Sequence, residues 1–213
     1  MHKGKIFCLG LSRTGTTSLH VAAVLAGFSS IHYPLCYNNL AIHWLKGDFS
    51  RSRIRDFQCF SDLPTPAFYR EFDRTHSGAK FILTRRDEAR WIESVQQIYA
   101  VQMAPSPKTP WRNCVSAACY GLVEFNRQRF LDVYRRHNAD VMNYFKDKPG
   151  KLLVLDLENE EAPWVPLCRF LNVSAPDLAF PKIRVPDLGS LSWVKADEIP
   201  VKTEKLKKLV RLS

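Results

Sequence analysis

The sequence predicts an α/β protein with three layers, in which helices cover both faces of a central, mostly parallel sheet. Short apolar runs alternate along the chain with segments of helical periodicity, which is the pattern of repeated strand–helix–strand units. With 213 residues and 46% hydrophobic content, the chain is long enough for one sizeable core. We therefore expect a single domain over residues 1–213, in which residues 195–213 form a basic, helical C-terminal tail.

Glycines and prolines divide the chain into the expected elements. Gly27 ends the first helix, a cluster of prolines between residues 105 and 110 forces a loop, and Pro149-Gly150 ends the longest helix. The expected strands cover residues 5–9, 30–33, 57–62, 80–84 and 151–156, and the expected helices cover residues 16–26, 38–45, 66–75, 87–103, 114–145 and 162–171.

The loop after the first strand has the features of a phosphate-binding strand–loop–helix. Gly10 and Gly15 have the G-x-x-x-x-G spacing of a P-loop, and the following helix would direct the positive end of its dipole at an anion. Thr16-Thr17 stands where a Walker A loop needs lysine followed by serine or threonine, and Arg13 lies inside the loop. This substitution indicates a phosphorylated ligand other than a nucleoside triphosphate. The alternative is a tight turn, with glycines for steric reasons and hydroxyl residues as helix caps.

Arg13-Thr-Gly-Thr-Thr-Ser-Leu19 resembles the 5′-phosphosulfate loop of the sulfotransferases that use 3′-phosphoadenosine 5′-phosphosulfate (PAPS). In that family the loop holds the phosphate that carries the sulfuryl group. The resemblance implies that Arg13 also neutralises charge on the leaving phosphate during the reaction. It implies a donor-binding role for Arg13, Thr14, Gly15, Thr16, Thr17 and Ser18.

A second segment resembles the family's 3′-phosphate motif. Arg86 follows an expected strand, and Ser94 stands eight positions later on the next expected helix, which is the family's spacing. A guanidinium group and a hydroxyl group together can satisfy a phosphate that carries nearly two charges. The alternatives are a surface salt bridge from Arg86 to Asp87 or Glu93 and an ordinary exposed position for Ser94.

Asp62-Leu-Pro64 stands where cytosolic sulfotransferases have a catalytic histidine before Leu-Pro. Other branches of the superfamily use a carboxylate as the base, so the resemblance implies that Asp62 removes the acceptor proton. A capping role for Asp62 at the helix after Pro64 is the alternative.

Two further segments are weaker candidates. The family often uses a C-terminal basic loop on the 3′-phosphate, which makes Lys182 and Arg184 cofactor-binding candidates beside the alternative of a solvated loop. Residues 104–112 combine prolines with Trp111 and Arg112, and they form either a lid over the acceptor or a packed connector. Five histidines belong to no recognisable motif, so we expect structural or exposed roles for them: His20, His32, His43, His76 and His137.

Composition limits the partners and the compartment. The formal net charge of +10 suits small polyanions, and no nucleic-acid-binding motif accompanies it. The six cysteines have no spacing typical of zinc, and no apolar run reaches the length of a signal peptide or a membrane span. These patterns predict a cytoplasmic protein without a metal, a membrane span or a nucleic-acid partner.

Taken together, the motifs predict a sulfotransferase that moves a sulfuryl group from PAPS to a hydroxyl or amine of a small-molecule or glycan acceptor, leaving adenosine 3′,5′-bisphosphate. Two other functions stay open. A nucleotide or nucleoside kinase would need a carboxylate for Mg²⁺, for which Asp156 at a strand end is the candidate. The other is a sulfotransferase-like protein that binds the nucleotide but lacks a competent base. The sequence names neither the acceptor nor the oligomeric state.

Overall fold

A six-stranded sheet forms the middle layer of the computed structural model, which describes residues 4–33, 40–50, 54–101, 110–183 and 192–212. The order of the strands across the sheet is β5-β4-β1-β3-β2-β6, with the five strands β1 to β5 parallel and β6 antiparallel to β2. The strands are β1 (Ile6–Cys8), β2 (Ser30–His32), β3 (Cys59–Ser61), β4 (Lys80–Arg85), β5 (Leu152–Asp156) and β6 (Trp193–Val194).

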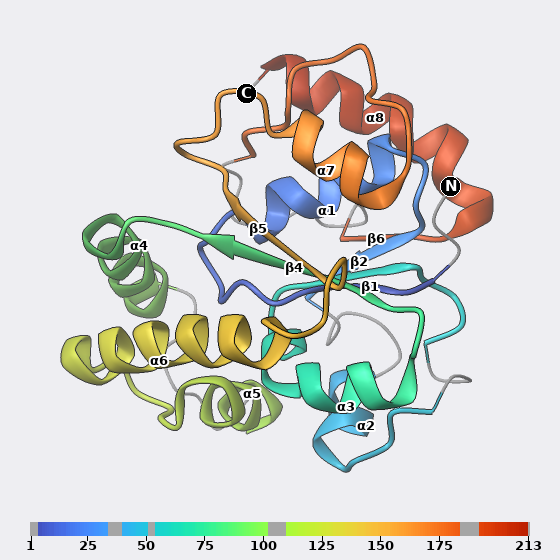
Figure 1. The fold of residues 1–213 in the computed structure, drawn as a ribbon. Helices are drawn as coiled ribbons and strands as arrows, with labels where there is room; N and C mark the ends of the chain where they lie inside the picture. Colours follow the sequence, from blue (N-terminus) through green and yellow to red (C-terminus); the bar gives the residue numbers. More distant parts are fainter. Residues whose placement is uncertain (1–3, 34–39, 51–53, 102–109, 184–191, 213) are drawn as a thin grey trace.

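Helices cover both faces of this sheet (Figure 1). One face carries α1 (Thr16–Leu25), α7 (Trp164–Leu171) and α8 (Ile199–Leu212), and the other carries α2 (Leu40–Leu45), α3 (Tyr69–Thr75), α4 (Glu88–Val101), α5 (Pro110–Tyr120) and α6 (Arg127–Phe145). The predicted three-layer α/β/α architecture with a mostly parallel sheet is therefore confirmed.

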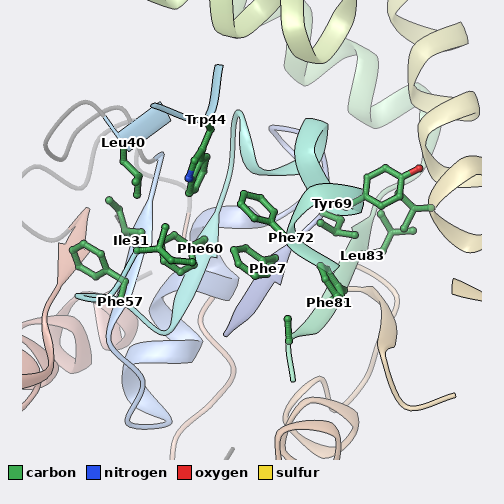
Figure 2. Close-up of a cluster of buried hydrophobic side chains, with 14 of the residues drawn as sticks. Phe7, Ile31, Leu40, Trp44, Phe57, Phe60, Tyr69, Phe72, Phe81 and Leu83 are labelled. Carbon is green, nitrogen blue, oxygen red and sulfur yellow. The ribbon is translucent and has the colours of Figure 1, made fainter. Parts of the chain in front are cut away.

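The central strand β1 is buried on both faces, as its continuous apolar sequence requires. Ile6 and Cys8 pack into the cluster beneath α1 and α7, whereas Phe7 belongs to the cluster beneath α2, α3 and α6. Figure 2 shows the second cluster, in which the ring of Phe7 stacks on that of Phe72 with 4.0 Å between centroids. This packing fixes the strand from which the phosphate-binding loop leaves the sheet.

The direction of the chain connections reverses at β1, since β3 lies on one side of it and β4 on the other. In open α/β sheets a ligand crevice forms at such a switch point, outside the carboxyl ends of the strands. The loop after β1, Asp62 after β3 and Arg86 after β4 all leave the sheet at this edge. The topology thus brings together three segments that are far apart in the sequence.

The structure corrects two expected elements and adds a strand. The helix expected over residues 114–145 is two helices, because Gly121 adopts a positive φ of 69° after α5 and Asn126 caps α6 by accepting a hydrogen bond from the Arg129 N–H. The helix expected over residues 66–75 begins only at Tyr69, because residues 66–68 belong to a 3₁₀ turn, Thr65–Phe68, before α3. The two-residue strand β6 is too short to give a periodic signal.

The segment 104–112, for which a lid and a packed connector were the alternatives, lies mostly outside the described residues, and its last three residues begin α5. Pro110 is the first residue of that helix, a position where its missing N–H costs nothing.

Candidate active site

The loop between β1 and α1 approaches its neighbours so closely that both of its glycines are required. A Cβ atom at Gly10 would lie 1.8 Å from the Thr84 Oγ1, and one at Gly15 would lie 2.7 Å from the Leu157 Cδ1. Gly15 also has a φ of 95°, and Arg13 has a φ of 73°. The conformation therefore depends on glycine for steric reasons, and it exposes the start of α1 to the cavity described below.

The hydroxyl residues of this loop do not cap α1, although the tight-turn alternative would require them to do so. Gly15 is the N-cap of α1, and no side chain caps the helix. The Thr14 hydroxyl donates to the Leu11 carbonyl oxygen at 2.7 Å, and the Ser18 hydroxyl accepts from the Ile183 N–H at 3.0 Å. These two hydroxyl groups hold the loop and the segment around Ile183 in place.

Arg13, Ser94 and Arg86 form one hydrogen-bonded group. The Arg13 Nε donates to the Ser94 Oγ at 2.9 Å, and the Arg86 Nη1 donates to the Arg13 carbonyl oxygen at 3.3 Å. Arg86 does not pair with Asp87 or Glu93 in the way one alternative expected: its Nη2 lies 2.8 Å from the Glu158 Oε1. Arg90 reaches the other oxygen of Glu158 at 3.7 Å.

Aromatic residues of α4 and α6 hold the backbone around Arg13 and Arg86 in place. The Trp91 indole N–H donates to the Ser12 carbonyl oxygen at 2.9 Å, and its ring stacks on Tyr134 with centroids 4.2 Å apart. The Tyr134 hydroxyl in turn accepts from the Arg86 backbone N–H and donates to the Arg86 carbonyl oxygen, at 2.9 and 2.7 Å. The backbone of Arg86 is thereby fixed relative to the loop.

Asp62 follows β3 with a φ of 66° and is 8% exposed. Burial raises the pKa of its carboxyl group to about 6, although polar contacts with Leu63 and Ser12 and the charge of Arg13 oppose the shift. The Oδ1 atom is buried and has no hydrogen-bond partner among the described residues, and the Oδ2 atom lies 3.4 Å from the His32 Nε2.

The capping alternative for Asp62 finds no support in the geometry. The 3₁₀ turn after it has Pro64 as its N-cap and no side-chain cap, and the Thr65 N–H bonds to the backbone oxygen of Asp62. The carboxylate of Asp62 is consequently not used in a helix cap.

One cavity of about 710 Å³ collects these side chains. It contains every candidate site residue that the structure describes, including the exposed Lys182; Arg184 lies outside the described residues. The cavity is lined in part by Arg13, Thr14, Gly15, Thr16, Thr17, Ser18, Asp62, Arg86, Ser94 and Lys182.

Sequence reasoning missed two residues that line this cavity. His32, expected to be structural or exposed, lies at the end of β2 with its Nε2 3.2 Å from the Thr17 Oγ1. Glu158 lies just after β5 and holds Arg86. Neither belongs to a motif, and the only signal was their position at the carboxyl ends of expected parallel strands.

The described residues contain neither a metal-binding cluster nor a helix that could span a membrane. No group of three or more histidine, cysteine, aspartate or glutamate side chains has a metal-binding arrangement within these ranges. None of the helices in the described part of the chain is long and apolar enough to cross a membrane.

Comparison with known proteins agrees with this geometry. A family model described as a sulfotransferase domain matches residues 5–187, which include the whole of the phosphate-binding loop, Asp62, Arg86 and Ser94. The chain is also similar to Ava biosynthesis cluster protein M of Aspergillus versicolor, with 25% identity over 221 residues that cover 86% of this chain and 82% of the relative. From the match over most of its length, we conclude that this chain belongs to the sulfotransferase domain family.

Proposed function

We propose that this chain transfers a sulfuryl group from PAPS to a hydroxyl or amine group of a small-molecule or glycan acceptor. One observation carries the proposal. Three segments separated by more than twenty residues in sequence, around Arg13, Asp62 and Arg86, line the same cavity at the carboxyl edge of the sheet. Each of them resembles a different functional motif of the same family.

The described residues fit an anionic nucleotide. The Arg86 Nε is buried and has no hydrogen-bond partner among the described residues, so a donor is ready for a ligand oxygen. Arg86 and Ser94 would hold the 3′-phosphate, and the loop from Arg13 to Ser18 would hold the 5′-phosphate. Lys182 and Arg184 remain proposed contacts, and Lys182 adds positive charge at the cavity.

The proposed chemistry assigns one task to each side chain. The donor supplies a sulfuryl group whose bond to a phosphate oxygen breaks as the acceptor attacks. Asp62 takes the acceptor proton, and its raised pKa of about 6 makes it a stronger base that is still mostly ionised above that pH. Arg13 offsets the negative charge that develops on the phosphate, so we propose transfer without a metal ion.

The kinase alternative has less support from the geometry. Asp156, its candidate ligand for Mg²⁺, uses Oδ1 to accept from the backbone N–H groups of Glu158 and Asn159, and Oδ2 to accept from the Asn159 side chain. The carboxylate thus stabilises the turn after β5.

A cytoplasmic location is also proposed, because all five cysteines within the described residues are free thiols, as is usual in a reducing compartment.

Calorimetry and a turnover assay test the proposal together. Adenosine 3′,5′-bisphosphate should bind to the purified chain more tightly than ATP with Mg²⁺, and mass spectrometry should detect sulfated products from a panel of phenols, alcohols, amines and sugars incubated with PAPS. Preferential binding of ATP with Mg²⁺ would point to the kinase instead. Tight binding of the bisphosphate without any product across the panel would favour the inactive binding protein.

A further inference from the structure

His32 and Asp62 face each other across two neighbouring strands. β2 and β3 are parallel, and His32 pairs in register with Ser61, the residue before Asp62. The side chains of His32 and Asp62 are 14% and 11% exposed, and both line the cavity. The 3.4 Å contact between the His32 Nε2 and the Asp62 Oδ2 therefore lies inside the proposed site of sulfuryl transfer.

Contacts at both ring nitrogens orient the imidazole of His32. Its Nδ1 lies 3.2 Å from the Ser61 Oγ, and its Nε2 lies 3.2 Å from the Thr17 Oγ1. The Ser61 hydroxyl donates to the Ile31 carbonyl oxygen at 3.4 Å, which leaves its oxygen to accept from an N–H at Nδ1. In this tautomer the lone pair of Nε2 faces Thr17 and Asp62.

The two oxygens of Asp62 differ in their access. Oδ1 is sealed from solvent and has no hydrogen-bond partner among the described residues. A proton from the cavity therefore reaches this carboxyl group at Oδ2, the oxygen beside His32.

Few other neighbours of Asp62 can exchange a proton near neutral pH. Besides His32, the titratable groups among the described residues that interact electrostatically with Asp62 include Arg13, Cys8, Cys119 and Tyr120. Burial raises the pKa of the Cys8 thiol to about 11 and raises those of Cys119 and Tyr120 further, so all three stay protonated. Arg13 remains a cation. An imidazole is the side chain suited to accept a proton from a carboxyl group in this pH range.

We propose that His32 takes up, through Asp62, the proton that leaves the acceptor, and that it is a positioning residue of the transfer reaction. The inference rests on the proposed function. As the acceptor's O–H or N–H bond breaks, its electron pair forms the bond to sulfur and its proton goes to the Asp62 Oδ2. The proton then passes to the Nε2 of His32, which leaves an imidazolium–carboxylate pair. Water in the cavity removes the proton before the next turnover.

Another histidine ring, that of His20, lies near the imidazole of His32, with 5.8 Å between the ring centroids. Its Nδ1 lies 2.8 Å from the Ser30 hydroxyl, within the buried interior. The carboxylate of Asp62 is a charged group within 3.4 Å of the His32 Nε2.

A proton titration followed by NMR tests the pair without any need for turnover. In wild type the Asp62 carboxylate stabilises an imidazolium at His32, so Asp62→Asn should move the titration midpoint of the His32 ring signals to lower pH by about half a unit or more. His43, whose Nδ1 lies 3.7 Å from Asp48, provides an internal control in the same spectra and should not move. An unchanged midpoint for His32 would overturn the proposal.

Activity measurements then separate proton uptake from simple packing. His32→Ala should lower kcat about tenfold or more, and added imidazole should restore part of the loss. His32→Gln should remain slow, because an amide can donate to Asp62 but cannot take up its proton. In both variants the affinity for adenosine 3′,5′-bisphosphate should stay close to that of wild type. Wild-type kcat in His32→Gln, or a loss of kcat in His32→Ala that imidazole does not relieve, would contradict the inference.

A wild-type protein that transfers no sulfuryl group would refute the proposed function alone, since the NMR titration still decides whether the pair of His32 and Asp62 exists.

Discussion

The two halves of the cavity differ in the charge of the polar group that each leaves without a hydrogen-bond partner among the described residues. On the half that we call the donor side (residues 12–18, Arg86 and Ser94), hydrogen bonds tie the loop to α4 and to the end of β4. On the half that we call the acceptor side (His32 and Asp62), the Asp62 Oδ1 is buried without a hydrogen-bond partner among the described residues, whereas on the donor side the corresponding atom is the Arg86 Nε. The donor side thus leaves a cationic donor unsatisfied, and the acceptor side leaves a carboxylate oxygen unsatisfied.

This difference has a physical cost and a chemical use. A buried polar atom without a partner costs about 1–3 kcal/mol. On the acceptor side the same lack of solvation raises the pKa of Asp62, which strengthens it as a base. We infer that the donor side serves to bind a fixed anion, and that the acceptor side sacrifices stability for proton transfer.

Replacing the base should have the largest effect on turnover and little effect on binding. Asp62→Asn should lower kcat by about 10²-fold or more, because the amide cannot take a proton. Its affinity for adenosine 3′,5′-bisphosphate, measured by calorimetry, should remain within about twofold of wild type, since the donor side is intact. Asp177→Asn removes the same charge at an exposed position and should leave both quantities unchanged. Equal losses of binding and turnover in Asp62→Asn would erase the distinction between the two sides.

Replacing the donor-side arginine should reverse that pattern. Arg86→Ala removes charged hydrogen bonds worth about 2–3 kcal/mol, so the affinity for the bisphosphate should fall about 30- to 150-fold. Arg86→Lys should restore only part of it, because an ammonium group lacks the planar fork of a guanidinium. The neighbouring Arg85 is exposed and does not line the cavity, so Arg85→Ala is the matched control. Normal bisphosphate affinity in Arg86→Ala would remove this residue from the donor site.

The acceptor side should gain stability when its charge is removed. Burial raises the pKa of Asp62 to about 6 in the folded chain, whereas the ordinary value for an aspartate is 3.8. The folded chain therefore holds the carboxyl proton of Asp62 more tightly than the unfolded chain does. Between these two values the free energy of unfolding therefore falls as pH rises, and above pH 6 the full cost, up to about 3 kcal/mol, is present.

Asp62→Asn avoids this cost because its side chain does not ionise. Urea unfolding at pH 7.5 should show a gain of about 1–3 kcal/mol for this variant over wild type, and the gain should shrink toward pH 4. A variant that is less stable than wild type at pH 7.5 would mean that the carboxylate stabilises the acceptor side.

Sequence patterns predicted the parts of this molecule in which local residues determine the geometry. The apolar run of β1 and the glycines of the following loop carry their own steric requirements, so the strand, the loop and the start of α1 were predictable. The break between α5 and α6 was not predicted, because Gly121 and Asn126 were outweighed by a nearly continuous apolar stripe through residues 114–145.

In the site, too, sequence patterns predicted only the residues whose placement depends on local geometry. Arg86 and Ser94 were predicted because a single strand and helix carry both at a fixed spacing. His32 ends β2 and Glu158 follows β5, and only the order β5-β4-β1-β3-β2 brings them to the cavity. Their contribution depends on which strands become neighbours, which the sequence of each strand does not specify on its own.

The smallest effect is expected at Glu158, which also gives the most discriminating test because its carboxylate places a negative charge on the donor side. Its carboxylate lies 2.8 Å from the Arg86 Nη2 and 3.7 Å from the Arg90 Nη1, where it would compete with the 3′-phosphate of the proposed ligand for the same donors. The side chains of Arg86 and Glu158 are 25% and 30% exposed, so solvent screens the pair and its contribution is modest. Glu158→Gln should therefore tighten binding of the bisphosphate about two- to fivefold, as measured by calorimetry. Glu160→Gln removes the same charge from an exposed position two residues later and should have a smaller effect. Weaker binding in Glu158→Gln would show instead that the carboxylate holds Arg86 in its binding orientation, and the donor side would then depend on an acidic residue for its rigidity.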